Sequence, residues 1–117
     1  MTDWHDVGSL EELERNGHLV ARIGGRDVGV VLDPIGGQPV GVRNRCPHTG
    51  APICLGIVLE RVSGTPGNYA LTGEPVLRCP WHGWEFDLET GRCRDDTTMR
   101  VAVYAAEVRD GRVLVQA

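Results

Sequence analysis

The sequence predicts one all-β domain built from antiparallel strands, and three observations support this fold class. Glycine and proline are frequent, with 16 and 7 among 117 residues, which is typical of a chain with many turns. Short apolar segments rich in β-branched residues alternate with these turns. Only residues 10–16 have the composition of a helix. Residues 1–117 fit a single domain by their length.

The expected elements begin with a short helix and a hairpin. The helix covers residues 10–16 (LEELERN) and ends at Gly17, because glycine is a common helix stop. Residues 18–23 and 26–32 are apolar on either side of Gly24-Gly25. Two such segments around a glycine pair predict a β-hairpin.

The following segments predict further strands and turns. Residues 33–39 (DPIGGQP) form a turn that leads into a strand at 40–44. At the other end of the chain, residues 101–117 predict a hairpin around Asp110-Gly111. Aspartate followed by glycine between apolar runs is the strongest turn signal in this sequence.

The composition excludes several classes of function. The formal net charge is −4, so the chain lacks the excess of positive charge that is typical of nucleic-acid-binding domains. It also has no polybasic segment that would bind anionic lipid. The N-terminus lacks the apolar region of a signal peptide, and no stretch approaches the ~20 apolar residues of a spanning helix. We therefore expect a cytoplasmic protein without a membrane or nucleic-acid partner. In that compartment the four cysteines would stay reduced, as metal ligands or free thiols.

Two loops each combine one cysteine with one histidine. The first, RNRCPHTG, holds Cys46 and His48, and the second, RCPWHGWEF, holds Cys79 and His82. Thiolate and neutral imidazole suit zinc or iron. Prolines and glycines in both loops restrict the turns and let the backbone approach a bulky group. The two loops therefore predict a metal centre.

The residues alone leave three interpretations of this centre open. The simplest interpretation is that the two Cys-His pairs occur by chance. Prolines and glycines surround both pairs in the same way, which argues against chance. A structural zinc site accepts two cysteines and two histidines, but zinc modules usually pair like with like. A Rieske-type 2Fe-2S cluster takes two cysteines on one iron and two histidines on the other.

The pattern C-P-H-x-G-A-P followed by C-P-W-H-G-W-x-F-D-x-x-T-G resembles the Rieske ferredoxin family. It is most similar to the electron carriers of ring-hydroxylating oxygenases, over almost the whole chain. The resemblance implies a Rieske-type antiparallel β-sandwich with a small cluster-binding subdomain at about residues 44–91. It also implies one 2Fe-2S cluster per chain. Its ligands would be two cysteines on the inner iron and two histidines on the outer, surface-facing iron: Cys46, Cys79, His48 and His82.

The resemblance also predicts a reduction potential near the low end of the Rieske range. Hydrogen bonds to the cluster sulfurs raise the potential. High-potential Rieske proteins carry a serine and a tyrosine where this chain has Trp84 and Phe86, and a loop-bridging disulfide at the positions of Ala51 and Trp81. We therefore expect a value toward the lower limit of about −150 to +300 mV. The potential should depend on pH in the alkaline range, because histidine ligands titrate more easily beside an oxidised cluster.

Some features depart from the family pattern. The segment 53–78 separates the loops about twice as widely as usual, and we expect an extended hairpin that is a tolerated insertion or a partner-docking element. Cys54 and Cys93 are spare and are expected to be small buried hydrophobes. Asp95 and Asp96 are expected in a solvated turn, and the alternative is that their negative charge lowers the potential.

The function expected from these features is one-electron transfer without substrate chemistry. Only His5 and His18 remain for an iron facial triad, and G-x-G-x-x-G for a dinucleotide is absent. The resemblance implies a flavoprotein reductase and a terminal oxygenase or related redox enzyme as partners. Two alternatives remain. One is a small subunit like that of assimilatory nitrite reductases, although those often lack the ligands. The other is a metal-stabilised redox-sensing or interaction module.

Overall fold

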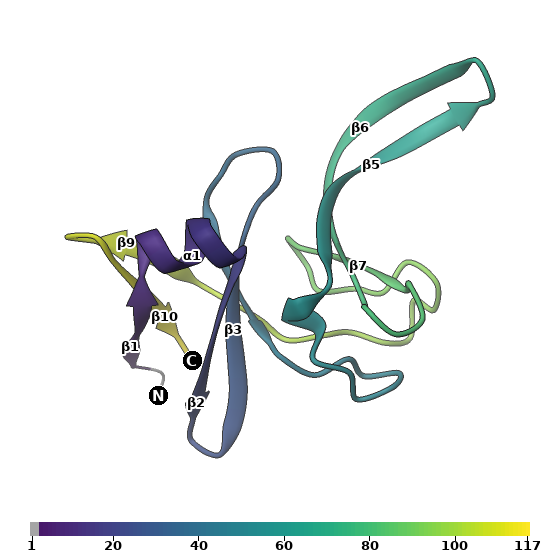
Figure 1. Ribbon diagram of the computed structural model, residues 1–117. Helices are drawn as coiled ribbons and strands as arrows, with labels where there is room; N and C mark the ends of the chain where they lie inside the picture. Colours follow the sequence, from purple (N-terminus) through teal and green to yellow (C-terminus); the bar gives the residue numbers. More distant parts are fainter. Residues whose placement is uncertain (1–2) are drawn as a thin grey trace.

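The computed structural model describes residues 3–117, which form three antiparallel sheets (Figure 1). Sheet A has the order β1-β10-β9, sheet B β2-β3-β4-β8, and sheet C β5-β6-β7. The elements are β1 (Trp4–Ser9), α1 (Leu10–Asn16), β2 (His18–Ile23), β3 (Arg26–Leu32), β4 (Pro39–Arg43), the 3₁₀ turn η1 (Ile53–Leu55), β5 (Ile57–Thr65), β6 (Asn68–Arg78), β7 (Glu85–Asp87), β8 (Val103–Tyr104), β9 (Ala106–Arg109) and β10 (Arg112–Gln116). The predicted antiparallel β architecture is confirmed.

The single α-helix among these residues is capped at both ends as the sequence predicted. The Ser9 hydroxyl accepts a hydrogen bond from the Glu12 N–H at 3.0 Å, which satisfies one free donor of the first turn. Gly17 adopts a left-handed φ of 82° and donates to the Leu13 carbonyl. Leu13 is buried, and it fixes the helix against the sheets. No helix within residues 3–117 is long and apolar enough to cross a membrane.

Strand β3 is buried on both faces and separates two hydrophobic cores. Val28 and Val30 point into the base core, between sheets A and B. Val31 points the other way, into the loop core beneath the two Cys-His loops. The base core comprises Leu13, Leu19, Val28, Val30, Val113, Val115 and Ala117. The loop core comprises Val31, Val42, Cys46, Ala51, Ile53, Cys54, Leu77, Cys79, Phe86, Leu88, Cys93 and Val101.

The predicted turns all lie where the sequence placed them. Strands β2 and β3 pair from Ile23 with Arg26, so the Gly24-Gly25 turn is confirmed. Strands β9 and β10 pair from Arg109 with Arg112 around Asp110-Gly111. Asp110 has a φ of 52°, which aspartate tolerates better than most side chains.

Strands β5 and β6 confirm the extended hairpin expected within residues 53–78. Its register closes with Thr65 opposite Asn68, and the hairpin projects away from the rest of the molecule (Figure 1). Three apolar side chains near its tip are at least half exposed, with 50% for Val62, 63% for Tyr69 and 68% for Leu71. The tip therefore adds little to either core.

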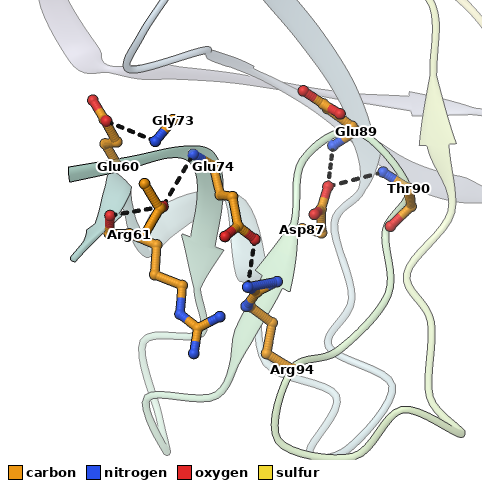
Figure 2. A network of polar contacts seen from close by, with 9 residues as sticks. Glu60, Arg61, Gly73, Glu74, Asp87, Glu89, Thr90 and Arg94 are labelled. Atoms are coloured by element: carbon orange, nitrogen blue, oxygen red, sulfur yellow. Dashed lines mark hydrogen bonds and ion pairs between the residues drawn. The ribbon is translucent and has the colours of Figure 1, made fainter. Parts of the chain in front are cut away.

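A polar network holds the base of this hairpin (Figure 2). At the bulge in β5, the Glu60 carboxylate accepts the Gly73 N–H at 2.9 Å. The Arg94 guanidinium forms an ion pair with Glu74, which ties β6 to the segment after β7. At the end of β7 the Asp87 carboxylate accepts N–H groups of the following turn. The base is thus anchored, whereas the tip is free.

We expect the chain to fold normally without the hairpin tip. Replacing residues 63–70 by Asn-Gly would leave Val62 opposite Leu71, a register suited to a two-residue turn. Because the removed side chains are exposed, the melting temperature should stay within about 3 °C of the wild type in differential scanning calorimetry. A fall of about 10 °C or more would show that the tip packs on the body.

Candidate metal centre

The first loop is closed by hydrogen bonds of its own backbone. The N–H of Cys46 donates to the Ala51 carbonyl at 2.8 Å, and the N–H of Gly50 donates to the Cys46 carbonyl at 2.7 Å. Gly50 has a φ of 78°, a left-handed conformation that favours glycine. At the entrance to the loop, the buried Asn44 side chain accepts the Cys54 N–H at 2.8 Å. The loop is therefore fixed at both ends.

The second loop repeats the same pattern. The N–H of Cys79 donates to the carbonyl five residues later, at Trp84, over 2.8 Å. The N–H of Gly83, four residues after the cysteine, donates back to the Cys79 carbonyl at 3.1 Å. Gly83 has a φ of 73°. Two segments 33 residues apart thus form matched loops, although the histidine follows the cysteine by two residues in one and three in the other.

The loops bring the four predicted ligands to one end of the loop core. Cys46 and Cys79 are 1% and 2% exposed, and both belong to the loop core. The rings of His48 and His82 are exposed, with centroids 5.5 Å apart and planes at 65°. The two thiols therefore lie inside and the two imidazoles outside, which is the order that the resemblance implies, and their ligation of a metal stays a prediction.

Hydrogen-bond donors surround the inner sulfurs. Burial acts to raise the pKa of the Cys46 thiol, but donors from Thr49, the His48 backbone and Cys79 outweigh it and hold that pKa below its ordinary value. The Thr49 hydroxyl also lies 3.8 Å from the Cys79 sulfur, across the two loops. An environment that favours thiolates fits sulfur ligation of a metal.

Three aromatic side chains of the second loop have different surroundings. Trp84 is half-buried and stacks on His48, with 3.7 Å between ring centroids and 2° between planes. Phe86 is 1% exposed and belongs to the loop core, whereas Trp81 is 60% exposed. Packing therefore explains Phe86, and Trp84 supports a histidine of the facing loop.

The segment after β7 approaches the first loop. The Asp95 carboxylate accepts the Glu85 N–H at 2.8 Å, so this exposed residue also fixes a turn. A hydrogen bond from Thr98 is the main cause that holds the pKa of Asp96 below its ordinary value, and the charge of His48 contributes less. The predicted exposed turn is present, and it places a carboxylate within electrostatic reach of His48.

The donor set of the two loops fits a two-iron cluster. Within residues 3–117, no three or more histidine, cysteine, aspartate or glutamate side chains gather at one ion position. Two thiols inside and two imidazoles outside would supply two protein ligands to each iron of a Rieske cluster.

The remaining cysteines belong to the loop core, and the remaining histidines lie on strands of sheets A and B. Cys54 and Cys93 are 1% and 0% exposed, so the prediction of buried hydrophobes is confirmed. Burial raises the pKa of Cys54 to about 12, which keeps it a neutral thiol. His5 lies on β1 and His18 on β2, outside both Cys-His loops.

Three residues of the site were not singled out by the sequence analysis. Thr49 links both loops, and the sequence signal for this role was its position inside the first loop. Asn44 anchors the first loop, and its signal was a polar residue at the end of an apolar strand. Gly56 has no space for a side chain, because an added Cβ would lie 1.8 Å from the Arg78 carbonyl oxygen. That contact brings the end of the first loop against the start of the second.

Comparisons with known proteins agree with this geometry. A family model described as the Rieske [2Fe-2S] domain matches residues 3–105. Pheophorbide a oxygenase from Oryza sativa subsp. japonica is 32% identical over 90 residues, which are 77% of this chain and 14% of that protein. Methylxanthine N1-demethylase NdmA from Pseudomonas putida is 31% identical over 96 residues, 78% of this chain and 22% of that protein. The chain thus spans less than a quarter of these curated relatives.

Solved structures of similar length show the same fold. A candidate NADH-dependent nitrite reductase small subunit from Mycobacterium tuberculosis has a TM-score of 0.81 at 26% identity, covering 100% of this chain and 96% of that one. A chain from the complex of reduced oxygenase and oxidized ferredoxin in carbazole 1,9a-dioxygenase has a TM-score of 0.68 at 24% identity, covering 97% and 92%. The predicted Rieske-type β-sandwich is confirmed.

Proposed function

Because the chain belongs to the Rieske [2Fe-2S] domain family, we propose that it is a one-electron carrier rather than an enzyme with its own substrate. The family assigns it one 2Fe-2S cluster. The proposed ligands are the thiols and imidazoles of the two loops: Cys46, His48, Cys79 and His82. We further propose that residues 1–117 form one domain, with residues 44–91 as its cluster-binding part.

The observation that supports this proposal is the arrangement of buried thiols behind exposed imidazoles. The bound cluster supplies a site that takes up one electron and releases it again. The loop core excludes water from Cys46 and Cys79. The exposed rings of His48 and His82 form the edge that a partner can approach. The matched hydrogen bonds of the loops keep these groups in place, so little reorganisation accompanies the change in charge.

The side chains around the sulfurs support a potential near the low end of the Rieske range. Trp84 and Phe86 offer no hydroxyl at the positions where high-potential members carry serine and tyrosine. The Thr49 hydroxyl, which lies 3.8 Å from the Cys79 sulfur and is also a donor toward Cys46, acts in the opposite direction, because a hydrogen bond to a ligand sulfur raises the potential. Asp96 adds negative charge toward His48, which disfavours the reduced and more negative cluster.

The proposed partners are a flavoprotein reductase that donates electrons and a terminal oxygenase or related redox enzyme that accepts them. Support comes from the similarity to chains of oxygenase systems, including the carbazole 1,9a-dioxygenase complex. A second candidate role is a small subunit held within a larger reductase, which the likeness to the Mycobacterium tuberculosis protein favours. The two roles differ in how long the chain stays bound to a partner. An electron shuttle must dissociate from one partner before it binds the next, whereas a subunit stays in its complex.

Spectroscopy and voltammetry on the purified protein test the proposal. We expect a Rieske-type EPR signal after dithionite reduction, two irons per chain, and a potential in the lower part of the range of about −150 to +300 mV. A colourless protein with one zinc per chain would overturn the cluster assignment. A potential above about +150 mV would contradict the low-potential assignment. Purification from the native host separates the roles, since a permanent subunit co-purifies with its enzyme in fixed ratio.

A further inference from the structure

Arginines gather on one side of the first Cys-His loop. Two adjoining hollows share Arg43 and Arg45 in their walls. The residues lining them include five arginines and a single carboxylate: Arg22, Arg26, Arg43, Arg45, Arg100 and Asp27. This local excess of positive charge contrasts with the net charge of −4 of the whole chain. We call this surface the arginine face.

The fold explains why these arginines meet. The backbone N–H of Arg43, at the end of β4, donates to the Ala102 carbonyl at 2.9 Å, which brings the 100–102 segment alongside β4. Arg45 follows two residues later, and its guanidinium lies beside Gly50 of the first loop. Residues far apart in sequence thus present their charges together.

Four of these five arginines form no ion pair within residues 3–117; Arg26 is half-buried beside Tyr104, and the other three face solvent. Six ion pairs form within residues 3–117, and none of them includes Arg43, Arg45 or Arg100. All three side chains are exposed. By contrast, Arg22 is paired with Asp27 at 3.1 Å. Three free guanidinium groups can therefore attract an external anion.

The arginine face is continuous with the edge that carries His48. Pro47 lines one hollow and Gly50 the other, so both belong to the loop on either side of this histidine. A protein that takes an electron through His48 must cover this surface. We propose that the arginine face is the docking surface for the redox partner and that it recognises an acidic patch on that partner. This inference rests on the proposed electron-carrier function.

Binding of an acidic probe to the cluster-loaded protein tests the inference directly. A fluorescein-labelled poly-glutamate peptide of about 20 residues should bind at about 10 mM ionic strength, where the Debye length is about 30 Å, and should be released by salt. The variant R43Q/R45Q/R100Q should bind it at least about five-fold more weakly by fluorescence anisotropy, because three unpaired charges are lost.

The matched control removes three arginines from elements other than the loops. R15Q/R109Q/R112Q changes the net charge equally, at side chains that are 63%, 62% and 51% exposed on α1 and the β9–β10 hairpin. This control should retain wild-type binding. Equal weakening by both triple variants would show a general charge effect and overturn the inference. If the protein co-sediments with phosphatidylserine vesicles as strongly as it binds the peptide, the arginine face would be assigned to a lipid surface. That result would likewise overturn the inference.

Electron transfer to two small oxidants separates this inference from the proposed function. The reduced cluster gives one electron to ferricyanide, which becomes ferrocyanide, or to tris(phenanthroline)cobalt(III), which becomes the cobalt(II) complex. Stopped-flow rates with anionic ferricyanide should fall roughly ten-fold in R43Q/R45Q/R100Q at low salt, and rates with the cationic oxidant should not fall. Equal rates with ferricyanide in both triple variants would contradict the docking surface alone. Failure of the wild type to reduce either oxidant would contradict electron transfer itself.

Discussion

Replacing Gly56 with alanine should destabilise the protein by roughly 2–4 kcal/mol and lower its iron content, because overpacking against backbone has no easy relief. An alanine Cβ would lie 1.8 Å from the Arg78 oxygen and 3.1 Å from the Ile53 oxygen. Both atoms belong to the main chain, so no rotamer change can move them. Relief requires β5 and β6 to separate where Ile57 pairs with Arg78, next to Cys79. Calorimetry and iron analysis of the purified variant measure the two effects.

Gly36 offers the matched control. Its Cβ would meet only the Gln38 side chain at 3.9 Å, and its backbone does not require glycine. Gly36→Ala should therefore keep the melting temperature and the iron content of the wild type. A Gly56→Ala variant that matches this control in both measurements would show that the close approach of the two loops is not needed for the site.

The turns could be predicted because their causes are local. Gly17, Gly24-Gly25 and Asp110-Gly111 each determine backbone geometry within a few residues, and the structure has turns at these places. The extended hairpin within residues 53–78 could likewise be expected, because two strand-like segments flank a local proline-glycine turn signal at Pro66-Gly67. Local sequence thus accounts for the order and bounds of most elements.

The details of the site depend on contacts between distant segments, which a single sequence does not reveal. The spacing of Cys46 and His48 indicates a metal loop, but the shared hydrogen-bond pattern of the two loops depends on backbone conformation. Thr49 reaches Cys79 from 30 residues away. Arg100 joins Arg43 only because the chain returns beside β4. The arginine face therefore could not be predicted from the net charge, because the net charge is a sum over the whole chain.

Changing His82 to cysteine should lower the reduction potential by roughly 100 mV or more, toward the value of about −400 mV of four-cysteine clusters. His82 is exposed and faces His48 across 5.5 Å, as expected for a ligand of the outer iron. A thiolate there adds one negative charge to both redox states, so a further electron is harder to add. Protein-film voltammetry measures the shift, and EPR with iron analysis reports whether the cluster is retained.

The matched control is His18→Cys, because His18 lies on β2, outside both Cys-His loops. This variant should retain the wild-type spectrum and potential, which separates ligand exchange from the mere addition of a thiol. Loss of iron in His82→Cys alone would still identify His82 as a ligand, since only the ligand position then affects the cluster. Unchanged spectra and potential in His82→Cys would exclude it, and the outer iron would then need another protein ligand.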